Sequence, residues 1–343
     1  EDKSKTDTEY SVIRFKIPEN EILSFNDKVR GVLSWKSDEI EDFVIARSDG
    51  TPTYNLAVVA DDKNMKISHI IRGEDHITNT IKQTLVYRVL NWRLPIFAHI
   101  PLIQDSSGQK LSKRDGKNNL VDFKQRGILP MAMLNYLARL GWSYDNQEFF
   151  SDKQAISWFS LRGIGKSPSK YDEKKLLNLC GKHLKALNSE ELFQSFLSYL
   201  KDYKRLNIHK KYEKKMKQLT SLFQDRCNSL GDIYENSKFL FSSLDYVSIF
   251  KKHSEEISNE TILIIENFIE ALNTEKILWK ADSIEDFIKG FCEVNKLTFR
   301  QIGIPLRVLI TGSTHSASIT DILEIIGKED TVYRLKTMIE KKK

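Results

Sequence analysis

The chain has 343 residues, of which 40% are hydrophobic and 29% charged, and it carries a formal net charge of +6. This composition is that of a globular protein of two or three domains, and its mildly basic balance permits a polyanionic partner. No apolar run approaches the roughly 18 residues that a membrane-spanning helix requires, and the polar start EDKSKTDTEY is not typical of a signal peptide. We therefore expect a cytoplasmic protein with no membrane partner.

The three cysteines, Cys180, Cys227 and Cys292, are odd in number and far apart. Their spacing predicts neither a disulfide framework nor a zinc site. A reducing compartment fits this pattern best.

Residues 11 to about 72 consist of short extended segments separated by Pro, Gly, Asn or Asp, which predicts strands. These segments are YSVIRFKI, ILSF, KVRGVLSW, DFVIAR, TYNLAVVA and ISHIIRG. Residues 79–92 then space Ile81, Leu85 and Val89 as a helix does, and Pro95 blocks its continuation before the apolar run IFAHIPLI. Strand, helix and strand form a βαβ unit, in which ligands bind at the carboxyl ends of the strands.

After about residue 123 the strand signals fade, and apolar residues recur at intervals of three and four. The segments with this pattern are LPMAMLNYLARLGW, DEKKLLNLCGKHLKAL, ELFQSFLSYLKDY, ETILIIENFIEALN and IEDFIKGFCEVN. The second half is therefore predicted to be helical, with candidate boundaries near residues 123–128 and 186–192. Positive charge gathers at residues 201–217, where it favours a solvated helix face over a polyanion site.

A cationic loop, DSSGQKLSKRDG at residues 105–116, follows the apolar run IFAHIPLI. Its composition is typical of a solvated turn. It equally suits a phosphate clamp, in which Lys110, Lys113 and Arg114 donate to an oligophosphate and Gly108 and Gly116 let the loop bend. The loop by itself leaves both interpretations open.

Four segments in one order resemble the bacterial glutamyl-tRNA synthetases, a family of class I aminoacyl-tRNA synthetases. They are SDGTPTYNLAVVADD at 48–62, HIIRGEDHITNT at 69–80, AHIPLIQDSSGQKLSKRDG at 98–116 and LPMAMLNYLARLGWS at 129–143. KLSKR is similar to the second signature of the class, usually written KMSKS. The first signature, a His-Ile-Gly-His motif, has no counterpart here, so we expect a fragment that is inactive alone.

The resemblance implies an α/β fold, a partial class I Rossmann-type nucleotide-binding fold, followed by an all-α half that binds tRNA and its anticodon. The implied domains are a remnant of the acceptor-binding insertion at 1–45, the second half of the catalytic fold at 46–125, a helical stem-contact domain at 126–190 and an anticodon-binding domain at 191–343.

The resemblance also implies site residues. Lys113 is the expected catalytic cation, assisted by Lys110 and Arg114, because charge builds up on the phosphoryl oxygens when a carboxylate attacks ATP. Contacts to ATP are expected from Asp75, His76, Leu102 and Lys113. Contacts to glutamate are expected from Tyr54, Arg72 and Val58.

Some of these residues have structural alternatives. An arginine at a strand end such as Arg72 offers a bidentate fork to a carboxylate, but it is more often a surface ion pair. Tyr54 taken alone suits a strand tyrosine in a core, Asp75 suits a helix N-cap, and His76 suits a structural histidine. The adjacent Asp61 and Asp62 resemble a strand-end feature of the family, and no metal site is expected there.

The helical half would contact tRNA. Lys170 and Lys182 lie in SPSKYDEKKLLNLCGKHL, which resembles the segment at the inner corner of tRNA. The family commonly has Trp and Asn where Asn178 and Cys180 stand. Phosphate contacts that weaken with salt are expected from basic residues further along the chain, namely Lys214, Lys215 and Arg226.

The implied reaction is activation of glutamate by ATP with Mg²⁺, followed by transfer to the 3′ end of tRNA-Glu or tRNA-Gln by a monomer. One alternative is a non-catalytic tRNA-binding protein derived from a synthetase, and another is a misacylating paralogue that charges tRNA-Gln. The short relative that glutamylates a modified tRNA base lacks an anticodon-binding half. This chain extends about two hundred residues beyond KLSKR, which disfavours that relative.

Overall fold

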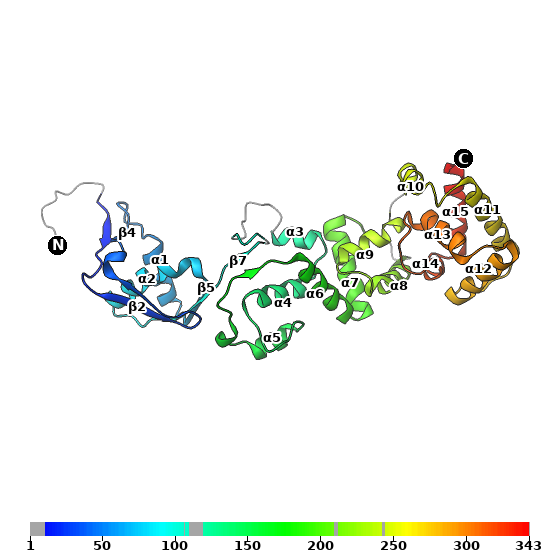
Figure 1. The fold of residues 1–343 in the computed structure, drawn as a ribbon. Coiled ribbons are helices and arrows are strands. Elements are labelled where there is room, and N and C mark those ends of the chain that lie inside the picture. Colours follow the sequence, from blue (N-terminus) through cyan, green and yellow to red (C-terminus); the bar gives the residue numbers. More distant parts are fainter. Residues whose placement is uncertain (1–10, 106, 110–118, 209–211, 242–243, 343) are drawn as a thin grey trace. The chain divides into compact units, whose positions relative to one another are not determined.

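The computed structural model describes residues 11–105, 107–109, 119–208, 212–241 and 244–342. The chain forms two compact units (Figure 1). The first, here called the mixed unit, contains Glu1–Ser112 and Leu134–Glu173, and the second, the helical unit, contains Lys113–Met133 and Lys174–Lys343. Each unit is described by itself.

The mixed unit is built on a four-stranded sheet in the order β3-β2-β6-β5. Strands β2 (Ile22–Asp27) and β3 (Gly31–Lys36) form an antiparallel hairpin, and β6 (Ile96–Ile100) runs parallel to both β2 and β5 (His69–Gly73). Two smaller sheets pair β1 (Ile13–Phe15) with β4 (Phe43–Ala46), antiparallel, and β7 (Ile103–Gln104) with β8 (Ser169–Lys170), parallel.

Helix α2 (Ile77–Val89) connects β5 to β6 after the short 3-10 turn η2 (Glu74–His76), which confirms the predicted βαβ unit. The other helical segments of this unit are η1 (Ser37–Glu39), α1 (Tyr54–Asn64), the end of α4 (Pro130–Gly141), α5 (Asp152–Trp158) and η4 (Leu161–Gly163).

The prediction of an extended segment at TYNLAVVA is wrong, because Tyr54–Asn64 is the helix α1. Two adjacent valines favour a strand locally, and the segment is too short for its periodicity to decide between strand and helix. Packing decides instead, since Val59 is buried in a cluster that includes α2. Asp61 and Asp62 consequently lie on the last turns of a helix rather than at a strand end.

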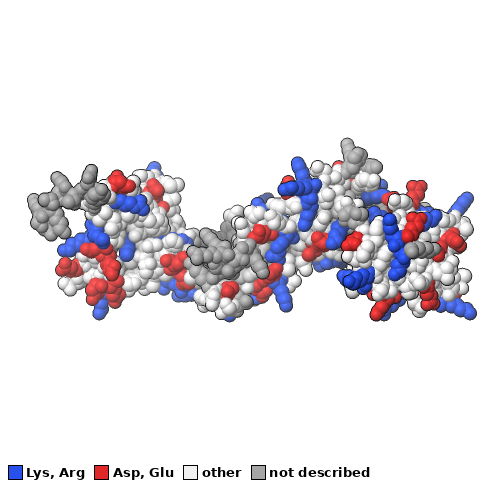
Figure 2. All heavy atoms as spheres, turned by 90° about the horizontal axis from the view of Figure 1, so that it is seen from above, with Lys and Arg blue, Asp and Glu red and all other residues white. Residues whose placement is uncertain are grey.

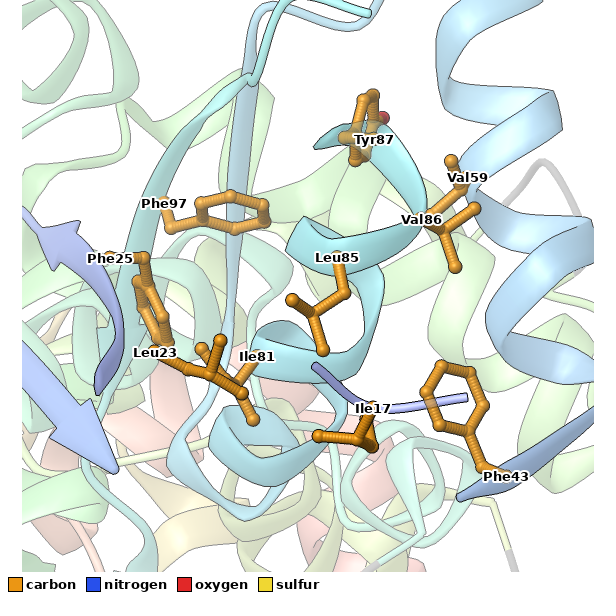
Figure 3. Packing of buried hydrophobic residues seen from close by; sticks show 10 residues of the cluster. All are labelled: Ile17, Leu23, Phe25, Phe43, Val59, Ile81, Leu85, Val86, Tyr87 and Phe97. Carbon is orange, nitrogen blue, oxygen red and sulfur yellow. The ribbon is translucent and has the colours of Figure 1, made fainter. Parts of the chain in front are cut away.

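The core of the mixed unit forms where α2 packs against the sheet (Figure 3). Helix α2 is buried around most of its circumference, and its apolar side chains share one cluster with Leu23 and Phe25 of β2 and Phe97 of β6. Strand β2 alternates exposed and buried residues, as expected for a half-buried strand. The buried members of this cluster are Ile17, Leu23, Phe25, Phe43, Val59, Ile81, Leu85, Val86, Tyr87 and Phe97.

In the helical unit every described segment of secondary structure is helical, from α3 (Leu120–Gln125) onward. The segments that follow are α6 (Glu173–Ala186), α7 (Ser189–Tyr199), the π-helix η5 (Leu200–Lys204), α8 (Glu213–Gln224), α9 (Leu230–Ser237), η7 (Lys238–Leu240), α10 (Tyr246–Lys252), α11 (Asn259–Thr274), α12 (Ala281–Asn295), α13 (Phe299–Thr311), α14 (Ile319–Ile326) and α15 (Lys328–Lys342).

Local sequence explains several of the helix ends. Asn188 caps α7 and forms a capping box with Glu191, and Gly312 ends α13 in the left-handed region at φ 76°. The α/β region followed by an all-helical region confirms the predicted fold class. Within the described ranges, no helix is both long and apolar enough to cross a membrane.

Candidate functional site

The carboxyl ends of β5 and β6 bring several predicted site residues together. Arg72 is the penultimate residue of strand β5, and Asp75 and His76 follow in η2. Tyr54, the first residue of α1, places its ring centroid 6.3 Å from that of His76. Tyr54 is 51% exposed, so it is not a core tyrosine.

The guanidinium of Arg72 is held by neutral side chains. Its Nη2 donates to Thr80 Oγ1 at 2.6 Å and to Gln83 Oε1 at 2.7 Å, and its Nε points at His99 Nε2 at 3.5 Å. Among the described residues no Asp or Glu forms an ion pair with it, so the surface ion-pair interpretation does not hold. Burial lowers the pKa of Arg72, and the phenol of Tyr54 opposes that shift through charge and hydrogen bonding.

A buried acid–imidazole pair lies beside this cluster. Asp27 Oδ2 is 2.7 Å from His99 Nδ1, and both side chains are fully buried. Asp27 Oδ1 also accepts the backbone N–H groups of Val29 and Arg30, which form the turn between β2 and β3. Burial lowers the pKa of His99, although the Asp27 carboxylate opposes this, so the imidazole is neutral at physiological pH.

Asp75 is not a helix N-cap. The N-cap residue of η2 is Gly73 and that of α2 is His76, neither through a side-chain hydrogen bond. The Asp75 carboxylate instead lies over Gly73, where a Cβ on that glycine would come within 2.5 Å of Asp75 Oδ1. The absence of a side chain at Gly73 therefore makes room for the carboxylate at the end of β5.

Glu74 joins two loops at the same end of the sheet. Its Oε1 accepts the backbone N–H of Leu102 at 3.0 Å, and its Oε2 forms an ion pair with Arg30. The carboxylate thus fixes the connection between β6 and β7 against the turn of the β2–β3 hairpin. A contact from Leu102 to a nucleotide through its N–H would have to share that hydrogen with Glu74.

The segment that leads into KLSKR begins as a tight turn. Asp105 Oδ1 accepts from the N–H and hydroxyl of Ser107 and from the N–H of Gln109, and Gly108 has φ 85°. That angle lies in the left-handed region, which agrees with the predicted use of Gly108 in bending the loop. Lys110, Lys113, Arg114 and Gly116 lie outside the described residues.

Two further residues of α1 near the cluster are Val58 and Asp62. Val58 is half-buried and packs against the core cluster. Burial raises the pKa of Asp62, while Arg72 acts in the opposite direction. Over the described residues, no group of three or more His, Cys, Asp or Glu side chains is arranged to hold a metal ion.

The predicted tRNA-binding residues differ in their exposure and, for Lys215, in a contact within the unit. Lys170 on β8, Lys182 on α6, Lys214 on α8 and Arg226 are exposed. The ammonium of Lys215, by contrast, donates to the Ile326 carbonyl at 2.7 Å and lies 3.3 Å from Asp330 Oδ2, so it ties α8 to the carboxyl-terminal helices. On the face shown in Figure 2, basic and acidic side chains are interspersed over the helical unit.

Cys180 serves packing in the helical unit. Its Sγ accepts the backbone N–H of Leu129 at 3.4 Å, and burial raises the pKa of its thiol to about 11. Asn178, two residues earlier on α6, is exposed. Cys180, Cys227 and Cys292 are all free and buried.

The helical unit also contains a cavity of about 540 Å³. Its lining includes Met216 of α8, Ile326 of α14 and Arg334 of α15, and of the predicted site residues it includes Lys215. The cavity lies in a different unit from the Arg72 cluster, and its lining is mostly apolar. We therefore place the candidate active site at the Arg72 cluster and not at this cavity.

Residues 1–178 match the family described as "tRNA synthetases class I (E and Q), catalytic domain". The chain belongs to this family. Residues 167–339 match a second family, described as "Anticodon binding domain", so a class I synthetase catalytic region is followed by an anticodon-binding region in one chain. The predicted resemblance and enzyme class are confirmed.

Individual relatives agree with this assignment to the class I synthetases. A glutamate–tRNA ligase of Pelagibacter ubique is 40% identical over 324 residues, which are 94% of this chain and 69% of that protein. A glutamate–tRNA ligase of Wolbachia pipientis is 38% identical over 333 residues, or 95% of this chain and 70% of that protein. The prediction of a ligase that uses glutamate is confirmed, and neither alternative function is supported.

Two solved structures match nearly the whole of this chain. A glutamate tRNA ligase of Elizabethkingia meningosepticum, crystallised in complex with its amino acid, has a TM-score of 0.81 and 30% identity, and the match covers 97% of this chain and 68% of that one. The glutamate–tRNA synthetase of Elizabethkingia anophelis has a TM-score of 0.78, also with 30% identity.

Sequence reasoning missed the residues that hold Arg72. These are Asp27, Thr80, Gln83 and His99, all of which are buried polar residues. The apolar spacing of α2 gave no signal for Thr80 and Gln83, because they lie on the side of the helix opposite Ile81 and Leu85, and both sides are buried. A signal was present for Asp27, which occupies an inward position of β2 after Leu23 and Phe25.

Proposed function

We propose that the Arg72 cluster is the glutamate-binding site of this synthetase, which activates glutamate with ATP and transfers it to tRNA. The observation that carries the proposal is the set of hydrogen bonds made by the guanidinium of Arg72. Its guanidinium is held in place by Thr80 and Gln83, which are neutral, and no carboxylate of the described residues pairs with it directly, although Asp62 and Asp75 act on its charge from farther away. The bonds to Thr80, Gln83 and His99 use Nη2 and Nε, which leaves the two N–H groups of Nη1 for a substrate carboxylate.

Tyr54 and Val58, both on α1, are the proposed companions of Arg72. The phenol of Tyr54 interacts with Arg72 and stands beside His76, where it offers one polar tip and an apolar face. Val58 would add an apolar contact from the same helix, although its present neighbours are those of the core cluster.

ATP is proposed to bind beside this site, at Asp75, His76 and Leu102, which follow strands β5 and β6. The Asp75 carboxylate can accept hydrogen bonds from ribose hydroxyls or the adenine amine. We assign the stabilisation of the phosphoryl oxygens to Lys113, with Lys110 and Arg114. Mg²⁺ would arrive with the ATP phosphates as part of the substrate.

The helical unit is proposed to bind tRNA-Glu. The exposed cations Lys182, Lys214 and Arg226 of this unit, together with Lys170 of the mixed unit, are the proposed phosphate contacts. We retain the predicted domains as proposals: 1–45 as part of the acceptor-binding insertion, 46–125 as catalytic, 126–190 as stem-contacting and 191–343 as anticodon-binding. A monomer that works in the cytoplasm, with ATP and free tRNA, completes the proposal.

The test is a steady-state comparison of Arg72→Ala, Arg72→Lys and the unaltered full-length protein in aminoacylation of tRNA-Glu. We expect Arg72→Ala to raise the KM for glutamate by about 10- to 150-fold, which corresponds to the ~1.5–3 kcal/mol of a charged hydrogen bond. The KM for ATP should change by less than about threefold, because Arg72 faces the amino acid.

Arg72→Lys keeps the charge, but an ammonium cannot bond Thr80 and Gln83 and present further N–H groups to a carboxylate as the planar guanidinium does, so it should recover less than about a tenth of the lost affinity for glutamate. Lys63→Ala, on the exposed last turn of α1, serves as a control for loss of one positive charge near the site. Equal increases of KM for both substrates in Arg72→Ala would place Arg72 outside the amino-acid pocket and contradict the proposal.

A further inference from the structure

Arg72 and His99 are adjacent because of strand register. Strands β5 and β6 are parallel, and Arg72 pairs directly with His99, so both side chains emerge on the same side of the sheet. Thr80 of α2 contacts both residues, with its Oγ1 at 2.6 Å from Arg72 Nη2 and 2.8 Å from His99 Nε2. The guanidinium is therefore held between the imidazole of His99 and helix α2.

The imidazole of His99 has one orientation and one tautomer. Asp27 Oδ2 accepts from the ring at Nδ1 at 2.7 Å and from the His99 backbone N–H at 3.0 Å. Since an ionised carboxylate can only accept, the ring hydrogen is on Nδ1, and Nε2 carries a lone pair. That lone pair faces the Nε–H of Arg72 and the oxygen of Thr80, whose single hydroxyl hydrogen has both Nε2 and the His76 carbonyl, 3.0 Å away, as possible acceptors.

The other tautomer of His99, with its hydrogen on Nε2, and the charged imidazolium would both be unfavourable. A hydrogen on Nε2 would point at the Nε–H of Arg72, and a charged imidazolium would stand against a guanidinium about 3.5 Å away in a buried setting. Burial, which lowers the pKa of His99, favours the neutral ring as well. Asp27 itself is fixed, because the N–H groups of Val29 and Arg30 bind its other oxygen.

We propose that Asp27 and His99 are positioning residues for glutamate binding: Asp27 fixes the His99 tautomer, and His99 with Thr80 orients the guanidinium of Arg72 without consuming its charge. This inference rests on the proposed role of Arg72 in the glutamate pocket. It assigns a function in substrate affinity to residues that are fully buried and touch no substrate.

The first test is Asp27→Asn, which has nearly the same shape. The amide oxygen of the new side chain can still accept from the turn and, at 3.3 Å, from the His99 backbone N–H, but its NH₂ group, in the place of Oδ2, faces His99 Nδ1 and favours the ring hydrogen on Nε2. We expect a rise in KM for glutamate of at least about tenfold, with the KM for ATP changed by less than about threefold. Nitrogen-15 NMR of the His99 ring should report the exchange of tautomers.

The second test substitutes Thr80, and it does not require the Asp27→Asn protein to fold. Thr80→Val replaces the hydroxyl by a methyl group of similar size, so Arg72 Nη2 loses one acceptor and the hydroxyl contacts with His99 Nε2 and the His76 carbonyl are lost as well. It should raise the KM for glutamate by about fivefold or more, and Thr80→Ser, which restores the hydroxyl, should return most of that loss.

The possible results distinguish a failure of this proposal from a failure of the assignment of Arg72 to the glutamate pocket. If Arg72→Ala leaves the KM for glutamate unchanged, the glutamate pocket itself is misplaced. If Arg72→Ala raises that KM but Thr80→Val and a folded Asp27→Asn do not, Arg72 needs no positioning and only the present inference fails. Equal KM changes for glutamate and ATP in Thr80→Val would indicate a general structural role and would also overturn it.

Discussion

Gly73 offers a way to test the proposed role of Asp75 without altering Asp75. A Cβ at position 73 would lie 2.5 Å from Asp75 Oδ1, whereas ordinary contact begins at 3.4 Å. The backbone at Gly73, with φ −63° and ψ 147°, accepts alanine without strain. In Gly73→Ala the carboxylate therefore has to withdraw by about 0.9 Å, while the strand stays in place.

That displacement is large enough to break a hydrogen bond. A bond of about 2.8 Å stretched by 0.9 Å exceeds the limit for a real hydrogen bond. Losing one charged hydrogen bond to ATP costs about 1.5–3 kcal/mol, which is about a 10- to 150-fold rise in the KM for ATP. The KM for glutamate should rise less, because the hydrogen bonds that hold the guanidinium of Arg72 come from Thr80 and Gln83, while Asp75 acts on it only through its charge.

The assay is aminoacylation by the full-length protein at varied ATP and at varied glutamate, with the melting temperature measured alongside. Gly290→Ala is the matched control, since a Cβ at that position on α12 meets no atom within 4 Å. A normal KM for ATP in a folded Gly73→Ala protein would refute the assignment of Asp75 to ATP. A lowered melting temperature with no kinetic change would make Gly73 a purely structural glycine.

Three further predictions concern stability and tRNA. Gly127→Ala should destabilise the helical unit by more than about 2 kcal/mol in urea unfolding, because its Cβ would meet the backbone N of Gly231 and alanine is strained at φ 77°. Lys214→Ala should lower the salt dependence of tRNA binding by about one phosphate contact, whereas Lys215→Ala should lower the melting temperature, since its ammonium bonds within the unit. Burial holds the pKa of His99 in the folded protein below its value in the unfolded chain, which is about 6.5. The contribution of His99 to the free energy of unfolding should therefore be fully present above pH of about 6.5 and should decline as the pH falls below it. Melting temperatures from pH 7.5 down to 5 should show this decline in the unaltered protein and a smaller one in His99→Gln.

The sequence by itself determined the parts of this protein that depend on neighbouring residues. The spacing of Ile81, Leu85 and Val89 predicted α2, and the turn residues around the short apolar runs predicted the strands of the main sheet. The four motif segments led to the family and, through it, to Arg72 as a candidate ligand for a carboxylate. These signals are local in the chain, which is why periodicity and motif order could carry them.

Only the tertiary structure decided what surrounds Arg72. Asp27 and His99 are 72 residues apart, and no local pattern relates an aspartate in one strand to a histidine in another. The same holds for α1, where two valines favour a strand and burial of Val59 against α2 selects a helix. Long-range packing overrides local preference wherever a buried group has to find its partner in a distant segment. In this protein those distant partners are the residues that hold the charge of Arg72 in position.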